Sequence, residues 1–353
     1  MPLLRSLLPS LRIAPRLCAT ALLVGCWRGD GSALPTVDVD PGPIVAHEVV
    51  LKRPVSPESD GWGFARAAAV RFDGDRMLVL ENGNSRLVVF DSAFRPLTYI
   101  GRPGAGPGEL RGIYGLAVWE GEYAITEVNN GRISVFGADG AFRRIVLLPN
   151  GFTQVGYGPG GTLYVSAYDQ RNYLLAIDRA GIARPFAERP WDLYPDAVLV
   201  TPLLPGGSVW FAITDGGVVH VYDPQLGALV KFGPDGRRLT ARRLPAALLD
   251  ALTKHAALAE RDFGGSGRGA LPQVTSFSAT DDGRLLLLFP AHEGMFGLLV
   301  DATTYRTRPL RWAPGTDPQL AGFGGVVHRG RFYRLASDEI RVFQLDSPVP
   351  RRR

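Results

Sequence analysis

Short apolar stretches recur along the chain, and each follows a turn that contains glycine. The stretches are five to seven residues long and rich in Val, Leu, Phe and Tyr. This length and composition predict β-strands, and glycine supplies the positive φ that tight hairpin turns need. The stretches are 77–81, 123–127, 162–168, 208–213, 284–289 and 331–336, and their turns contain Gly74, Gly121, Gly161, Gly207, Gly283 and Gly330.

The spacing of these turns indicates an internal repeat. Successive turn glycines are 47, 40, 46, 76 and 47 residues apart, so only the fourth interval is unusual. A period of about 40–50 residues that holds four short strands is typical of a propeller blade. We therefore predict an all-β fold, a six-bladed β-propeller of four-stranded blades that spans residues 44–346. The strand assignment within residues 208–244 stays open.

The long fourth interval contains a helical pattern. Residues 245–263 begin with a proline, which is favoured at the first turn of a helix. Apolar residues then recur at spacings of three and four, as one face of a helix requires. The run 264–269 that follows is rich in glycine. We predict a helical insertion over residues 245–269.

The first two repeats match in detail. Glu81–Arg86 leads into a strand that ends at Phe90, and Glu127–Arg132 leads into one that ends at Phe136. Together with the glycine-rich linker Gly101–Leu110, this string resembles the NHL-repeat class of six-bladed propellers over residues 60–150. The resemblance implies a six-bladed ring.

The two ends of the repeat array complement each other. After Gly330 the chain has room for a second strand and for a third at Ile340–Leu345, so the last blade lacks its outer strand. Residues 44–53 form an apolar stretch that belongs to no blade. We predict that this N-terminal strand closes the ring as the missing outer strand, which would pair two otherwise open sheet edges. The alternative is a strand that pairs elsewhere.

The N-terminus has the features of an export signal. A basic segment precedes an apolar run, residues 17–25, that is too short to cross a bilayer as a helix. The string 23–26 then resembles a bacterial lipobox, which implies lipid attachment to Cys26. An ordinary signal peptide is the alternative. We predict a lipoprotein signal peptide at 1–25, a flexible tether at 26–43 and a basic tail at 347–353. Trp27 rather than aspartate after the cysteine favours the outer membrane or periplasm over the inner membrane.

The charge and cysteine content narrow the functions. The first 25 residues carry three arginines and no acid, so the net charge falls from +5 to about +2 without them. No basic block outside the C-terminal tail marks a nucleic-acid surface, and we expect no nucleic-acid partner. The chain retains one cysteine after residue 25, which gives no disulfide framework.

The long connections suggest where a site would lie. In an antiparallel meander the connections after the second and fourth strands lie on one face, and binding residues concentrate on such loops. Because Arg86 and Arg132 repeat, we favour a structural role for both, in ion pairs with the preceding glutamates. The candidate ligand-binding residues are Glu81, Asn82, Arg86, Glu127, Asn129, Arg132, Asp169, Arg171, His255, His292 and Glu293.

Two functions remain open. The first is a membrane-anchored extracytoplasmic module that binds or scaffolds a protein, peptide or glycan. The alternative is a metal-dependent hydrolase or lyase with a site at the axial channel, which rests on fold analogy alone. The sequence contains no GxSxG, HExxH, CxxC or Walker motif, and it names no catalytic residue. We predict no cofactor, with calcium on carbonyl and carboxylate oxygens as an open alternative.

Overall fold

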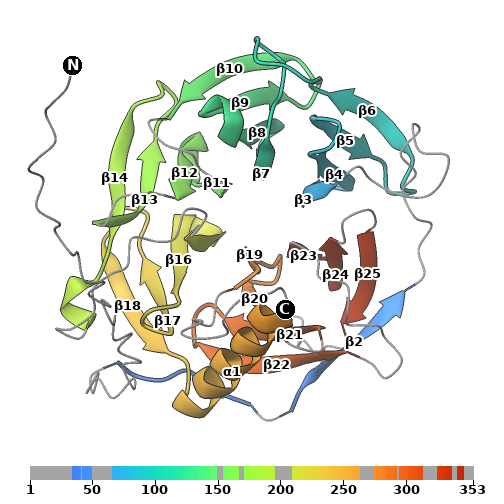
Figure 1. Cartoon of the computed structure of the whole chain (residues 1–353). Coiled ribbons are helices and arrows are strands. Elements are labelled where there is room, and N and C mark those ends of the chain that lie inside the picture. The colour runs from blue at the N-terminus through green and yellow to red at the C-terminus, as the bar shows by residue number, and fades with distance from the viewer. Residues whose placement is uncertain are drawn as a thin grey trace, which may run out of the picture. The chain divides into compact units, whose positions relative to one another are not determined.

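The chain forms an all-β propeller of four-stranded blades with one α-helix (Figure 1). The computed structural model describes residues 34–40, 42–49, 66–148, 154–166, 171–194, 209–262, 274–291, 294–312, 324–335 and 340–345. The chain divides into the units Met1–Asp30 and Gly31–Arg353, and every described residue belongs to the second. The predicted signal peptide, Cys26 and basic tail therefore lie outside the described residues. No helix in the described ranges is long and apolar enough to cross a membrane.

Four separate sheets have four antiparallel strands each. The first contains β3 (Ala67–Asp73), β4 (Arg76–Glu81), β5 (Arg86–Phe90) and β6 (Pro96–Ile100), and the second contains β7 (Ile113–Trp119), β8 (Glu122–Glu127), β9 (Arg132–Gly137) and β10 (Phe142–Leu147). The third contains β11 (Val155–Tyr157), β12 (Leu163–Ser166), β13 (Asn172–Ile177) and β14 (Ala183–Glu188), and the fourth contains β15 (Trp210–Thr214), β16 (Val218–Asp223), β17 (Ala228–Phe232) and β18 (Arg238–Arg243).

The remaining strands form one nine-stranded sheet, in which the N-terminal strand β2 is central. Its path is β19 (Ser276–Ala279), β20 (Arg284–Ala291), β21 (Gly294–Asp301), β22 (Arg306–Trp312), β2 (Ile44–Val49), β25 (Ile340–Leu345), β24 (Arg331–Leu335) and β23 (Gly324–His328), and β1 (Asp38–Val39) pairs with β22. Strand β2 runs antiparallel to β25, with Ala46 opposite Leu345, and also parallel to β22. The prediction that the N-terminal strand lies beside the last strand of the chain is confirmed. The observed strand ends at Val49, and residues 50–53 lie outside the described ranges.

The first strands of the repeats surround a common centre. Strands β3, β7, β11, β15, β19 and β23 contact one another in that order, and β23 contacts β3 again. Figure 1 shows these strands innermost, with β6, β10, β14 and β18 at the rim. Apolar side chains fill the spaces between neighbouring sheets. One cluster joins Leu80 of β4 to Leu116 of β7, and another joins Tyr173 of β13 to Val221 of β16.

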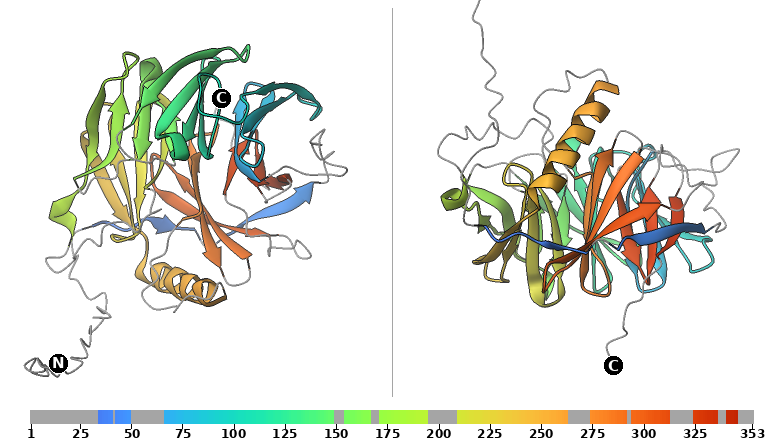
Figure 2. Two further views of the ribbon diagram at one scale, coloured as in Figure 1. Left: turned by 45° about the horizontal axis from the view of Figure 1, so that its top comes forward. Right: turned by 90° about the horizontal axis from the view of Figure 1, so that it is seen from below.

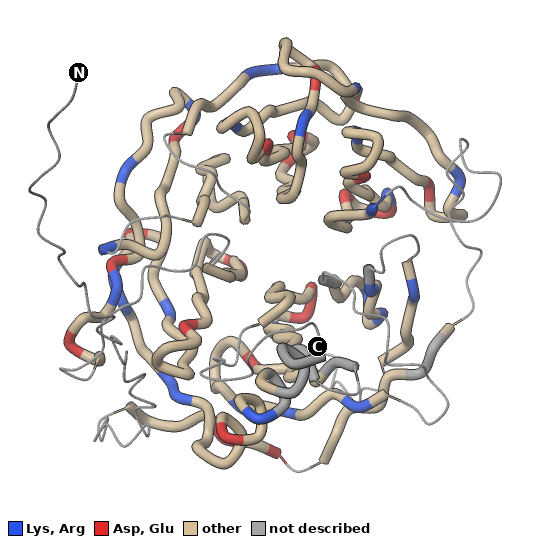
Figure 3. The backbone as a smooth tube through the Cα atoms, viewed as in Figure 1, with Lys and Arg blue, Asp and Glu red and all other residues tan. Residues whose placement is uncertain are grey.

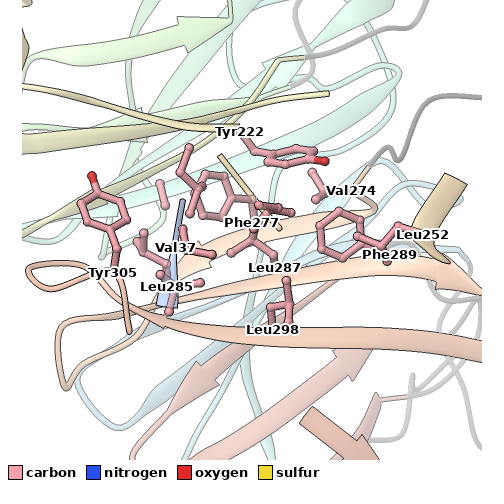
Figure 4. Packing of buried hydrophobic residues seen from close by; sticks show 14 of the residues in the cluster. Val37, Tyr222, Leu252, Val274, Phe277, Leu285, Leu287, Phe289, Leu298 and Tyr305 are labelled. Carbon is pink, nitrogen blue, oxygen red and sulfur yellow. The ribbon is translucent and has the colours of Figure 1, made fainter. Parts of the chain in front are cut away.

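The helix α1 (Ala246–Asp262) confirms the predicted helical segment. It projects from one face of the ring (Figure 2). Leu249 and Leu252 are buried and pack with Leu285 and Leu287 of β20 (Figure 4). The first half of the helix is therefore part of the core between the fourth sheet and β20.

The structure gives the strand assignment of the fourth repeat, which the sequence left open. By analogy with the other repeats, the stretch 208–213 would be the strand that follows the hairpin turn. Strand β15 is instead the first strand of its sheet, and the hairpin turn follows it at Asp215–Gly217. Gly216 and Gly217 both have positive φ there. Two glycine pairs each precede an apolar stretch in this region, and local pattern alone cannot distinguish them. The pair at 206–207 lies outside the described residues.

The C-terminal part of the predicted flexible tether is bound to the ring. The Val37 amide donates a hydrogen bond to the Arg243 carbonyl, and Asp38 pairs with Arg306 of β22. The Val37 side chain is buried among the residues of the same core cluster as α1 (Figure 4). This part of the tether prediction is wrong, because a segment that satisfies backbone groups of outer strands and buries an apolar side chain is ordered. We call residues 34–49 the strap.

Candidate functional site

The Glu127 carboxylate lies at the end of β8 and is completely buried. One of its oxygens accepts hydrogen bonds from Arg132 Nε, at 2.8 Å, and from the Ser134 hydroxyl. The other accepts from the Arg111 amide, at 3.1 Å, and from Asn130 Nδ2, at 2.6 Å. A carboxylate offers about four acceptor positions. All of them are occupied, so Glu127 has no remaining capacity for a ligand.

Arg132, the first residue of β9, is equally committed. Beyond its bond to Glu127, Nη1 donates to the Ala105 carbonyl, and Nη2 donates to the carbonyls of Gly106 and Glu109. The planar guanidinium therefore ties the Gly101–Leu110 linker to the second sheet. The structural role favoured from the repeat is confirmed for this pair. The same contacts confirm that the linker and the 127–132 loop lie on one face.

The first repeat contains the equivalent pair. Arg86 Nε donates to the Glu81 carboxylate over 2.6 Å, and both side chains are buried. The Arg86 guanidinium also lies 4.6 Å from the ring centroid of Tyr99 on β6, a cation–π arrangement. The pairing predicted for Arg86 is thus confirmed, and the pair braces its own blade.

The two asparagine candidates differ in environment. Asn82 is partly buried, and its side-chain oxygen accepts a hydrogen bond from the Ile113 amide of β7 over 3.2 Å, which links the first two sheets. Asn129 is exposed and packs against Gly112, where a Cβ atom would clash with it. Of the two, only Asn129 presents its side chain to solvent.

The remaining candidates are not brought together by the described structure. Arg171 is exposed, and its carbonyl accepts a hydrogen bond from the Arg189 amide. His255 lies on α1. Asp169, His292 and Glu293 lie outside the described residues, so their predicted ligand roles stay predictions. Among the described residues no three His, Cys, Asp or Glu side chains form a group suited to a metal ion.

Three exposed residues lie on the segments that adjoin the Glu127 network. Arg111 and Asn129 are exposed, and the Tyr114 ring is 45% exposed at the start of β7. The backbone beneath them is fixed, because Glu127 binds the Arg111 amide and Val128 donates its amide to the Gly112 carbonyl. Arginine and tyrosine are enriched at protein interfaces. We call Arg111, Tyr114 and Asn129 the loop patch. Of the three, only Asn129 was a candidate from the sequence, although Arg111 and Tyr114 closely follow the Gly101–Leu110 linker.

A buried polar cluster joins the third and fourth sheets and carried no sequence signal. Asp223 at the end of β16 accepts hydrogen bonds from the hydroxyls of Tyr173 and Tyr194 and from two backbone amides. Burial raises the pKa of each of the two tyrosines above its usual value, and the nearby Asp223 charge adds a smaller effect in the same direction. The Arg189 guanidinium lies over the Tyr173 ring at 4.6 Å. The cluster spans two blades, as the bond from Tyr123 to Asp73 does, and we interpret it as a joint between sheets.

A cavity of about 370 Å³ lies among the short turns on the opposite face, between β3–β5 and β23–β25. The His328 ring stacks on Phe72 with centroids 4.0 Å apart, and Asp75 pairs with Arg329 beside it. Burial lowers the pKa of His328 below its usual value. The cavity is lined by turn residues, whereas all the predicted site residues were placed on the long-loop face.

Comparison with known proteins indicates the fold alone. No protein-family model matches the chain, and no curated protein sequence matches it. Many solved structures resemble it at low identity, among them the following three. A protein of Bacteroides fragilis that is described as an exported protein is 14% identical, with a TM-score of 0.55, over 90% of this chain and 99% of that one. Virginiamycin B lyase from Staphylococcus aureus is 11% identical, with a TM-score of 0.51, over 80% of this chain and 96% of the lyase. A structural-genomics protein of unknown function from Bacteroides thetaiotaomicron is 11% identical, with a TM-score of 0.51, over 89% of this chain and 76% of that one. This chain is similar in fold to a group of propellers that includes exported bacterial proteins and a lyase.

Proposed function

We propose that the chain is an exported, lipid-anchored β-propeller that binds a protein, peptide or glycan partner through its long-loop face. The loop patch is the observation that carries this proposal. It combines a solvent-exposed arginine, tyrosine and asparagine on a backbone held by a saturated, buried ion pair. A pre-organised surface loses less conformational freedom on binding than a flexible one, so its contacts contribute more to affinity.

We further propose six blades of the NHL-repeat-like class. Strands β19–β22 would form the fifth blade, and β23–β25 with β2 the sixth, joined into one sheet because β2 also contacts β22. The ring of contacts among the six innermost strands supports this count. The repeated Glu–Arg pairs of the first two sheets support the NHL-like class.

The loop patch gives a direct test. We expect the triple substitution Arg111→Ala, Tyr114→Ala and Asn129→Ala to weaken binding of the native partner about thirtyfold, because truncating a central interface residue costs about 2 kcal/mol or more and each 1.4 kcal/mol is a tenfold change. Recovery would be measured by crosslinking in the native envelope and quantitative mass spectrometry.

The matched control for the loop patch is the pair Ile182→Ala and Arg184→Ala, two exposed positions near the short-turn end of the third sheet. Both variants should melt like the native protein. Equal partner recovery from the native and triple-substituted proteins would contradict the proposal, as would an equal loss in the control.

Membrane attachment depends in this proposal on Cys26. We expect Cys26→Ser to release the protein from the membrane fraction, because serine cannot form the thioether that carries the lipid. The measurement is the distribution between membrane and soluble fractions, together with incorporation of a labelled fatty acid. A Gly25→Ala change keeps a small residue before the cysteine and should retain both. Membrane retention and label in the Cys26→Ser protein would contradict the anchor. The Trp27 position supports outer-membrane or periplasmic placement within the same proposal.

The hydrolase or lyase alternative stays a prediction from the fold, as does calcium binding. The resemblance to virginiamycin B lyase does not identify a catalytic residue in this chain, because a likeness at 11% identity is one of fold.

A further inference from the structure

The strap joins the ring at the outer strand of the fourth sheet. The Arg243 amide of β18 donates a hydrogen bond to the Pro35 carbonyl, and Leu34 packs against the same apolar cluster as Leu193. Leu193 belongs to a short 3-10 helix, η3 (Trp191–Leu193), that follows β14. The first described residues of the chain therefore lie beside η3 and β18.

The distance from this point to the proposed lipid is short. Cys26 precedes Leu34 by eight residues. An extended chain spans at most about 3.5 Å per residue, so eight residues reach no further than about 28 Å. If Cys26 carries a lipid as proposed, that lipid would keep Leu34 close to the bilayer surface.

The surface at this side has the residue types that favour a membrane interface. Trp191 is 40% exposed and packs against Tyr194, with ring centroids 5.3 Å apart. Leu239 on β18 is 54% exposed. Tryptophan is enriched where proteins meet the headgroup region, because its ring is apolar and its N–H is polar.

An ion pair links the two parts of this surface. Arg238 of β18 makes a bidentate pair with Asp192 of η3, with both N–O distances 2.7 Å. A hollow of about 470 Å³ lies between them, lined by Trp191, Arg237 and Glu188 among others. Arg237 is exposed at its edge, and guanidinium groups bind phosphate oxygens strongly. Figure 3 shows basic positions along the outer strands, including β18.

We propose that the edge formed by residues 188–193 and 237–239 rests on the membrane that carries the lipid anchor. Trp191 and Leu239 enter the headgroup region, and Arg237 contacts phospholipid phosphates in the hollow. We call this surface the membrane edge. The inference rests on the proposed anchor at Cys26, and it goes further because it assigns the bilayer a binding surface on the folded ring. The loop patch, in the second sheet, is left available to a partner.

Photocrosslinking tests this orientation independently of cellular lipidation. The mature chain, residues 26–353, has Cys26 as its single cysteine, so a maleimide phospholipid can be coupled there chemically. The photoreactive residue p-benzoylphenylalanine would replace Leu239 in one protein and Leu147 in another. Leu147 is a matched control, an exposed leucine on the outer strand β10 of the second sheet. Vesicles of phosphatidylethanolamine and phosphatidylglycerol would carry an alkyne-tagged lipid.

We expect about tenfold more lipid adduct at position 239 than at 147, as for a surface seated in the interface. The double change Trp191→Ala and Arg237→Ala should lower the adduct at 239 while leaving the melting transition in place. Equal adduct at 147 and 239, or none at either, would overturn the proposal. An unchanged yield in the double variant would show that the tether alone sets the orientation and would also overturn it. Because the lipid is attached chemically, failure of the Cys26→Ser test in cells would count against the anchor and not against this surface.

Discussion

Glu127→Ala should lower the free energy of unfolding by about 3–5 kcal/mol, the range for removing one partner of a buried ion pair. The substitution leaves the Arg132 guanidinium buried and releases the four donors that the carboxylate now accepts. It also loosens the Gly101–Leu110 linker, which Arg132 holds through three carbonyls. Urea unfolding curves with an unchanged slope would give the value.

The control for Glu127→Ala is Asp139→Ala. Asp139 forms an ion pair of similar length with Arg143 in the same sheet, but both side chains are half exposed. Exposed pairs are weakened by solvent and salt, so we expect no measurable change. Equal unfolding free energies in the two variants would show that the Glu127 network does not stabilise the fold. Arg132→Lys should resemble Glu127→Ala, because an ammonium group cannot reproduce the planar set of donors.

A chain that begins at residue 50 should lose its single cooperative unfolding transition. Such a chain lacks the strap, so β25 keeps β24 but loses β2, its antiparallel partner on the other side, and Val37 and Ile44 leave the core. The loss of β2 and Ile44 falls on the junction between the C-terminal strands and β22, where β2 is the connecting strand. The loss of Val37 falls on the cluster between the fourth sheet and β20. Unfolding would be followed by tryptophan fluorescence and near-ultraviolet circular dichroism, which should cease to coincide.

A chain that begins at residue 34 is the matched control and should unfold like the mature protein, since it retains the whole strap. If the shorter chain is insoluble, Ile44→Ala provides the test within the full chain. Ile44 is 1% exposed, and its truncation should cost about 2–5 kcal/mol. Coincident two-state transitions with the native slope in the chain from residue 50 would contradict a role for the strap in closure.

Much of the blade architecture could be predicted from local sequence. The hairpin turns at Gly74 and Gly121 require positive φ, and the apolar stretches after them have strand length, so the second strand of each hairpin was identified. The Glu–Arg spacing of five residues likewise predicted both buried ion pairs, because each spans a single loop between adjacent strands. The strand assignment of the fourth repeat could not be made from the sequence, since two glycine pairs there give the same local pattern.

The candidate site was less predictable. Glu127 and Arg132 were selected as binding residues because they lie on long loops, but the hydrogen bonds that saturate them come from residues up to 27 positions away. Arg111 and Tyr114 gave no pattern of their own, and their exposure follows from how the linker folds over Glu127. The Asp223 cluster collects residues 50 positions apart and has no signal in any single repeat.

The sequence by itself determined the repeating strands, their turns, the helix and the short-range ion pairs, because each depends on residues within one hairpin or one helical turn. It also indicated a strand before the first blade, and this strand needed a partner strand. The tertiary structure alone decided that residues 34–40 are bound along β18 and β22, and that α1 contributes to the core. These outcomes depend on backbone groups and apolar surfaces that are left open at the outer strands, and such surfaces exist only once the sheets have assembled.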